Sequence, residues 1–140
     1  MVKASAIMRT DVITVARDED ICEAIRIMVL NNVTGLPVVN DDGIMAGILT
    51  EKDVLKLLHG GLDKGGAVEQ FMTTDVVSFA PDDNLTDIAD CFMRSRFRRV
   101  PIVSQGRLVG ILSRKDIIRY ISSLKQTVKT ARKDAVEIVY

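Results

Sequence analysis

Apolar residues recur along this chain with two different spacings, and the change of spacing occurs at matching places in the two halves. Short apolar runs, typical of buried strands, occupy residues 36–39, 45–49, 100–103 and 108–112. Within each half the two runs are separated by a polar turn that ends in a glycine, Gly43 or Gly106. This pattern predicts one β-hairpin in each half.

Helical spacing of apolar residues precedes each predicted hairpin. The repeating positions are Ile21, Ala24, Ile25, Met28 and Val29 in the first half, and Leu85, Ile88, Ala89, Phe92 and Met93 in the second. A second helix is expected after each hairpin, where Thr50 and Ser113 are good N-cap residues. Short β-prone stretches at 13–15 and 77–79 come before the first helices. Each half therefore predicts the order β-α-β-β-α.

The two halves are copies of one unit. A shift of 64 positions superimposes residues 8–12 on 72–76 and residues 36–39 on 100–103, with Pro and Asp at the same places. Two such units that each expose an apolar face are expected to pack around a pseudo-two-fold axis, with equivalent residues on opposite sides of a shared cleft. The predicted fold class is α+β, built from a tandem repeat.

A glycine-rich linker separates the copies, with four glycines in residues 59–66. We expect a single module over residues 1–140. Its parts are repeat one at 4–58, a linker at 59–67, repeat two at 68–121 and a helical extension at 122–140. The extension is expected to cover the module, pair with another chain or continue into a further domain.

Composition narrows the function classes. Lys plus Arg and Asp plus Glu balance at 19 each, which gives no reason to expect nucleic acid or an anionic membrane as partner. The sequence has neither an apolar run long enough to span a bilayer nor a signal peptide, so a cytoplasmic location is expected. Cys22 and Cys91 are expected as reduced, buried or half-buried thiols. We find no nucleophile–base pair, zinc spacing or phosphate-binding glycine loop, so neither an enzyme nor a metal site is expected.

Three motifs recur in both copies, in the same order. They occupy 8–12 and 72–76, then 35–39 and 99–103, then 47–53 and 110–116. Together they resemble the CBS domain family, named after cystathionine β-synthase. The resemblance implies a Bateman module, a non-catalytic sensor that binds AMP, ADP, ATP or S-adenosylmethionine between its repeats and requires no cofactor. It also implies a homodimer and a regulated protein that the sequence does not identify.

The best candidate site residues lie where each second helix begins. Thr50 and Asp53 stand three positions apart, as do Ser113 and Asp116. A hydroxyl at a helix N-terminus suits a phosphate, and the resemblance implies that the aspartate accepts the hydroxyls of a ribose. The alternative is a capping box without a ligand, and both hold together in the empty protein.

Two arginines, Arg98 and Arg99, are further candidates because guanidinium groups make bidentate contacts to phosphate. The family arrangement implies that Asp53 shares a cleft with Arg98, Arg99 and Pro101. The other cleft is then expected to join Asp116 with Thr34, Gly35, Leu36 and Pro37. Since Thr34 and Gly35 replace the two arginines, we predict that the Asp53 cleft is the better phosphate site. The alternative is a solvated basic helix end.

The remaining candidates concern the adenine ring and its surroundings. By family resemblance Val12, Ile13, Val76 and Val77 line an apolar slot on the first strands, and Arg114 stands beside Ser113. The alternative for the four apolar residues is ordinary strand core. The alternative for the whole chain is a structural or dimerisation module whose clefts stay empty.

Overall fold

Both halves fold in the predicted order in the computed structural model, which describes residues 1–131 and the side chains of residues 1–124. Repeat one contains β1 (Val15–Ala16), α2 (Ile21–Asn31), β2 (Gly35–Val39), β3 (Met45–Thr50), α3 (Glu51–Leu55) and the 3-10 turn η1 (Lys56–His59). Repeat two contains α4 (Leu85–Arg94), β4 (Arg99–Ser104), β5 (Arg107–Ser113) and α5 (Arg114–Ala131). A short helix α1 (Ala4–Ile7) and a 3-10 turn η2 (Val68–Gln70) precede the two repeats.

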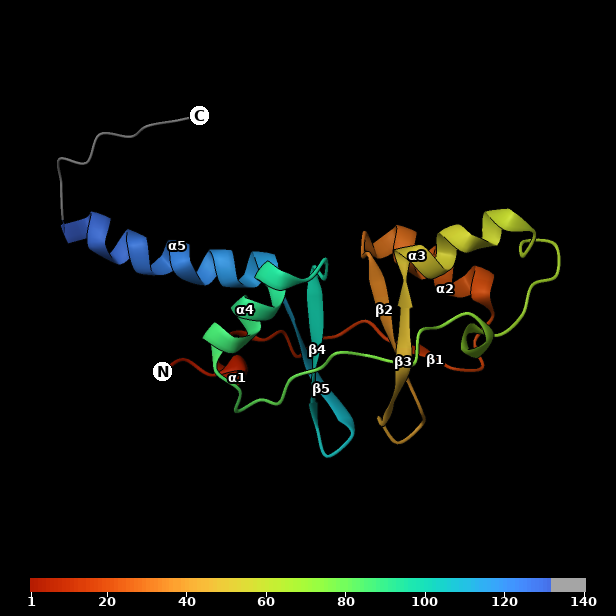
Figure 1. Ribbon diagram of the computed structural model, residues 1–140, viewed down its shortest axis with the longest axis horizontal. Coiled ribbons are helices and arrows are strands. Elements are labelled where there is room, and N and C mark those ends of the chain that lie inside the picture. Colours follow the sequence, from red (N-terminus) through yellow and green to blue (C-terminus); the bar gives the residue numbers. More distant parts are fainter. Residues whose placement is uncertain (132–140) are drawn as a thin grey trace.

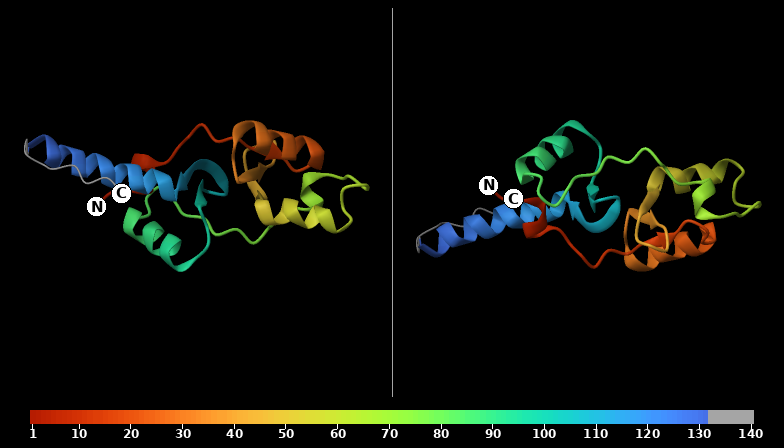
Figure 2. Two further views of the ribbon diagram at one scale, coloured as in Figure 1. Left: turned by 90° about the horizontal axis from the view of Figure 1, so that it is seen from above. Right: turned by 90° about the horizontal axis from the view of Figure 1, so that it is seen from below.

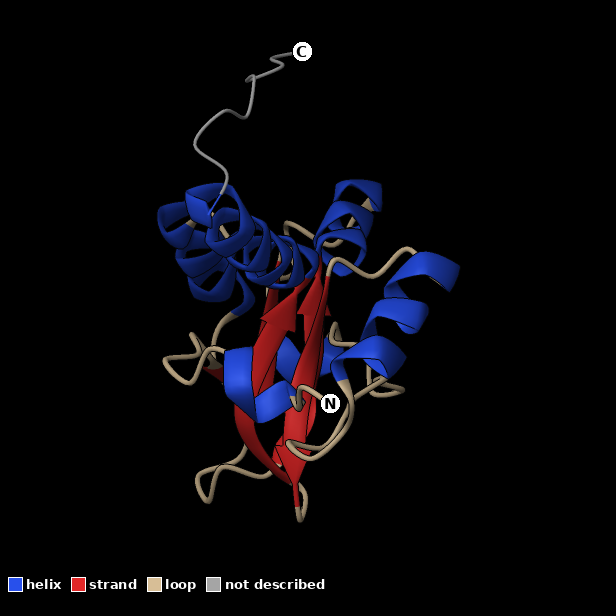
Figure 3. Cartoon of the chain, turned by 90° about the vertical axis from the view of Figure 1, so that its left-hand side faces the viewer, coloured by secondary structure: helices blue, strands red, loops and turns tan. Residues whose placement is uncertain are grey.

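The two predicted hairpins stand next to each other in the middle of the molecule, and the helices of the two repeats lie toward opposite ends (Figures 1 and 2). Figure 3 shows the strands enclosed by helices on several sides. The turns of the hairpins also meet, because Met45 N–H donates to the Gly106 carbonyl and Leu108 N–H donates to the Gly43 carbonyl. Both glycines have a positive φ, 83° and 80°, which a residue with a side chain rarely adopts.

The first strands are shorter than the sequence predicts. β1 has two residues, which pair in parallel with Val38 and Val39 of β2, and in repeat two a single bridge joins Phe79 to Ile102. The candidates Val12, Ile13, Val76 and Val77 therefore lie in extended chain ahead of these strands, and their expected place on the strands is wrong.

The reason for the short strands is an exchange of the segments that lead into each repeat. Residues 2–9, the first lead-in segment, pack against the core of repeat two, and residues 67–73, the second, pack against the core of repeat one. Since each lead-in segment must cross to the other repeat, the chain joins its own sheet only at the last residues before the turn. The exchange interlocks the two repeats into one body.

Two apolar clusters form the core, one for each repeat. The first consists of Val15, Ile21, Ala24, Met28, Leu36, Val38, Leu49, Leu57 and Val68, and the second of Ala4, Leu85, Ile88, Phe92, Val100, Ile102, Leu112 and Ile117. Each fully buried Leu, Ile or Val stabilises the fold by about 1.5–3 kcal/mol. Val29 and Met93, which the helical spacing placed on the apolar faces, are exposed instead.

The last helix, α5, reaches Ala131 and projects away from the hairpins (Figure 1). The part of the predicted extension from 132 to 140 lies outside the described residues. Ile117 of α5 is buried, whereas Ile118, Ile121 and Leu124 are exposed.

The burial of the two cysteines and the length and polarity of the helices can be compared with two further expectations from the sequence. Both cysteines are free; Cys91 is partly buried as expected, but Cys22 is exposed because it lies on the outer side of α2. Among residues 1–131, no helix combines the length and the apolar character that a membrane span requires. The cytoplasmic location expected from the sequence stays a prediction.

Candidate functional site

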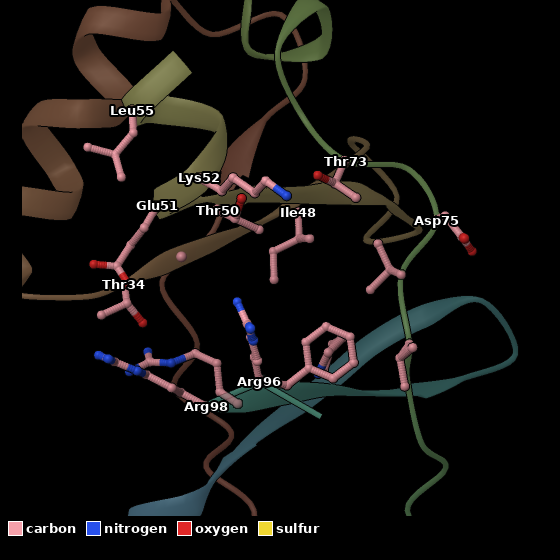
Figure 4. Close-up of a pocket in the computed structure, with 16 residues that line it drawn as sticks. Thr34, Ile48, Thr50, Glu51, Lys52, Leu55, Thr73, Asp75, Arg96 and Arg98 are labelled. Atoms are coloured by element: carbon pink, nitrogen blue, oxygen red, sulfur yellow. The ribbon is translucent and has the colours of Figure 1, made fainter. Parts of the chain in front are cut away.

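A cavity of about 400 Å³ opens between the two repeats. Its volume lies within the range of roughly 300–1,000 Å³ that is usual for small-molecule sites. The lining residues are Thr34, Gly35, Ile48, Thr50, Glu51, Lys52, Leu55, Thr73, Asp75, Val76, Val77, Arg96, Phe97, Arg98, Arg99 and Pro101. In Figure 4, Thr50, Lys52 and Ile48 lie on one side of this space and Arg96 and Arg98 on the other. We call it the Asp53 cleft after the carboxylate described next.

Asp53 lies beneath the lining of this cleft and is 7% exposed. Its Oδ2 accepts from the backbone N–H of Thr50 at 2.9 Å, and its own N–H donates to the Thr50 hydroxyl at 3.2 Å. The capping box that was the alternative interpretation is thus present. The hydroxyl of Thr73 also donates to the carboxylate, 3.1 Å from both oxygens. Since Thr73 is neutral, another hydroxyl can take its place without loss of a charge pair.

Four cationic side chains line the Asp53 cleft: Lys52, Arg96, Arg98 and Arg99. The Nε of Arg99 is buried without a hydrogen-bond partner among the described residues. Burial lowers the pKa of this guanidinium, and Arg9 and Arg98 act in the same direction, whereas Asp116 and Glu51 oppose the shift. A buried donor without an acceptor is unfavourable. An anionic acceptor beside Arg99 would relieve that penalty.

The structure corrects the predicted partners of the second aspartate. Thr34 and Gly35 line the Asp53 cleft and not the cleft of Asp116. The hairpin register explains this, because Gly35 pairs with Thr50 across β2 and β3, and Glu51 N–H donates to the Thr34 carbonyl at 3.2 Å. Leu36 and Pro37 are fully buried in β2 and line neither cleft.

A smaller cleft of about 230 Å³ surrounds Asp116. It is lined by Arg9, Asn31, Asn32, Val33, Arg99, Ile111, Ser113, Lys115, Asp116 and Arg119. Asp116 and Ser113 form the same reciprocal pair of hydrogen bonds as their counterparts, at 2.9 and 3.1 Å. Asp116 Oδ1, however, is also bound by two guanidinium groups, Arg9 at 3.2 Å and Arg119 at 3.1 Å. The two clefts are unequal in both volume and charge pairing.

Arg114 has a structural task instead of the predicted place in a site. Its guanidinium donates to the carbonyls of Phe92, Ser95 and Phe97, each at 2.7 Å. It also lies over the ring of Phe92, 5.8 Å from the centroid. These guanidinium hydrogen bonds hold the end of α4. Arg114 is not among the residues that line either cleft.

The apolar candidates separate into two groups. Val76 and Val77 line the Asp53 cleft, as do Ile48 and Phe97, which the sequence analysis missed. Val12 and Ile13 are not among the residues that line either cleft. The missed residues that contact the aspartates are Thr73, Arg9 and Arg119. The sequence did contain a clue to Arg9 and Thr73, because they occupy the same position of the repeated first motif.

Comparison with known protein families supports the repeat. A family model described as "CBS domain" matches residues 4–60 and again residues 68–123. An uncharacterized protein of Methanocaldococcus jannaschii, MJ1225, is 39% identical over 117 residues, which are 84% of this chain. The chain spans 42% of the length of that relative.

Solved structures with the same fold contain adenosyl compounds. The chain is similar to CBSX2 from Arabidopsis thaliana, solved in complex with AMP, with a TM-score of 0.82 and 28% identity; the match covers 89% of this chain and 99% of the other. It is also similar to the CBS domain pair of protein MJ0100, solved with 5′-methylthioadenosine and S-adenosyl-L-methionine. That match has a TM-score of 0.75 and 28% identity and covers 89% of this chain and 98% of the other.

Proposed function

The chain belongs to the CBS domain family, and from this premise we propose that it is a non-catalytic regulatory module whose Asp53 cleft binds an adenosyl ligand. The candidates are AMP, ADP, ATP and S-adenosylmethionine. One observation carries the proposal: a buried carboxylate, held by a neutral hydroxyl, underlies a 400 Å³ cavity whose opposite wall is cationic. The adenosyl compounds in the solved relatives support the same ligand class.

Each part of the ligand has a matching group in the cleft. The ribose hydroxyls bond to Asp53 in place of Thr73, because a carboxylate accepts several hydrogen bonds at once. The adenine ring packs among the apolar side chains of Ile48, Val76 and Val77. Phosphates, or the carboxylate of S-adenosylmethionine, lie beside the guanidinium groups of Arg98 and Arg99.

Regulation follows from the place of the cleft between the repeats. A ligand there contacts both hairpins and shifts the module toward the arrangement that it binds more tightly, by no more than its differential affinity for the two states. The regulated protein is not identified by the chain itself.

We also propose that the module forms a homodimer, since apolar side chains on its helices are exposed, among them Leu30, Met93 and Ile118.

The proposal is tested by calorimetric titration of the chain with each of the four compounds, with native mass measured on the same sample. We expect saturable binding of at least one compound, accompanied by an increase in the melting temperature. A stable dimer that binds none of the four would contradict the proposal and favour a dimerisation module with empty clefts.

Arg98→Ala is expected to weaken binding of a phosphorylated ligand about tenfold, because a charge-assisted contact at an exposed position is lost. Binding of adenosine, which has no phosphate, should change less than twofold. Calorimetric affinities for AMP and adenosine measure the two effects. Arg26→Ala is the control, since Arg26 lies exposed on α2 and pairs with Glu23 away from both clefts. Equal losses for AMP and adenosine would remove Arg98 from the phosphate site.

A further inference from the structure

Arg9 and Thr73 occupy equivalent places in the two clefts. Arg9 exchanges two backbone hydrogen bonds with Ile111 of β5, and Thr73 exchanges the same two with Ile48 of β3, all at 2.9 Å. Ile48 and Ile111 are themselves equivalent in the repeat. The two lead-in segments thus present residues 9 and 73 from the same backbone position toward Asp116 and Asp53 respectively.

The side chains at these two places differ in charge. Thr73 contributes a neutral hydroxyl to Asp53, and Asp53 forms no ion pair among residues 1–124. Arg9 contributes a guanidinium to Asp116, and Arg119, one turn further along α5, contributes a second. The counterpart of Arg119 in repeat one is Lys56, which is not within ion-pair distance of Asp53.

We propose that Arg9 closes the Asp116 cleft to nucleosides, so that the chain has one adenosyl site and not the two that its repeats would allow. This inference rests on the proposed function of the Asp53 cleft. In that cleft a ribose exchanges one neutral hydroxyl for another. In the Asp116 cleft it must displace cations from a carboxylate that is 8% exposed, and its neutral hydroxyls do not replace a charge-assisted bond.

Solvent exposure of the two arginines opposes this effect in part, and the smaller volume of the cleft adds to it. Arg9 and Arg119 are 56% and 61% exposed, so solvent screens the outer parts of both side chains, but the shared acceptor is buried and is held from two sides. The volume around Asp116 is about 230 Å³ against about 400 Å³ around Asp53, so the guanidinium groups also occupy room that a nucleoside needs.

The test rebuilds the second cleft with the residues of the first. Arg9→Thr introduces the residue found at position 73, and Arg119→Lys introduces the residue type found at position 56. Stoichiometry is measured by calorimetric titration with the four adenosyl compounds on the unmodified chain, on R9T and on the double variant R9T/R119K. We expect one site per chain in the unmodified protein, removed by Asp53→Ala, and two in the double variant, the second removed by Asp116→Ala. Thr73→Arg should close the first cleft and abolish binding.

Arg17→Thr is the matched control. It removes an exposed arginine from another pair between a repeat and a lead-in segment, the 2.8 Å contact with Glu69, and should leave the stoichiometry at one. Arg9→Gln removes the charge but keeps the methylene groups and a polar end, and it replaces R9T if that variant does not fold.

The possible outcomes separate this inference from the proposed function. Two sites in the unmodified chain, or one site in both the R9T/R119K and R9Q proteins, would overturn the role of Arg9 while ligand binding at Asp53 stands. A single site that is lost in D116A and kept in D53A would overturn both this inference and the assignment of the ligand to the Asp53 cleft. Binding to none of the proteins would overturn the proposed function and this inference together.

Discussion

Asp53→Ala is expected to weaken binding of the adenosyl ligand about a hundredfold, because two hydrogen bonds to a charged acceptor are lost. The buried carboxylate is the acceptor for the ribose hydroxyls in our account, and an alanine side chain has no acceptor. Calorimetric titration of wild type and variant at one pH and salt concentration measures the change in Kd.

Asp116→Ala is the matched control for this experiment. Both aspartates are buried, and both form the same reciprocal hydrogen bonds with an N-cap hydroxyl residue. Each substitution therefore removes the carboxylate half of a capping box, while the N–H of residue 53 or 116 can still donate to the N-cap hydroxyl of Thr50 or Ser113. Affinity should change less than twofold in D116A. Equal losses in both variants would mean that the effect comes from the caps and not from a ribose contact.

Gly47→Ala is expected to destabilise the fold by about 2–3 kcal/mol, the upper part of the usual range for an added group in a packed position. A Cβ at residue 47 would lie 2.6 Å from the carbonyl oxygen of Thr73 and 2.9 Å from the Met72 sulfur. The Thr73 backbone is fixed by its two hydrogen bonds with Ile48, so relief requires movement of the second lead-in segment. Such a loss corresponds to a fall in melting temperature of about 10 °C.

The control for this prediction is Gly61→Ala in the linker. There the nearest atom to a new Cβ, at 2.8 Å, is the end of the Leu57 side chain and not a backbone atom. The melting temperature of G61A should stay much closer to that of the wild type. If G47A melts like G61A, the lead-in segment is not held as tightly against β3 as the structure indicates.

Local patterns predicted most of the fold. The hairpins at residues 36–49 and 100–112 and the helix starts after Thr50 and Ser113 follow from apolar runs, turn glycines and capping residues, which act over a few positions. The exchange of the lead-in segments did not follow. It depends on contacts such as Ala4 with the second core and Val68 with the first, which join residues far apart in the sequence and leave no local period.

The candidate site was predicted only in part, because its arrangement also depends on contacts between residues far apart in the sequence. Arg98, Arg99 and Pro101 do line the cleft of Asp53, which the family arrangement implied, although their contact with a ligand stays a prediction. Gly35 was placed in the wrong cleft, since its pairing with Thr50 depends on a register shift between Val38 and Val39 that a regular count from the Gly43 turn does not give.

The use of individual arginines was beyond sequence reasoning. Arg114 donates to the carbonyls at the end of α4, and Arg9 forms an ion pair with a carboxylate of the opposite repeat. A guanidinium reaches equally well toward a ligand, a carbonyl or an aspartate, so its partner is decided by packing and not by spacing.

The central claim is that Asp53 marks the one adenosyl site of this chain. A crystal structure grown with the tightest-binding of AMP, ADP, ATP and S-adenosylmethionine tests it most directly. Our account predicts one ligand per chain in the Asp53 cleft, with its ribose hydroxyls within hydrogen-bond distance of Asp53 and its anionic group beside Arg98 or Arg99. A ligand whose ribose is bound to Asp116, or an Asp53 cleft that is empty at a saturating concentration, would contradict the account.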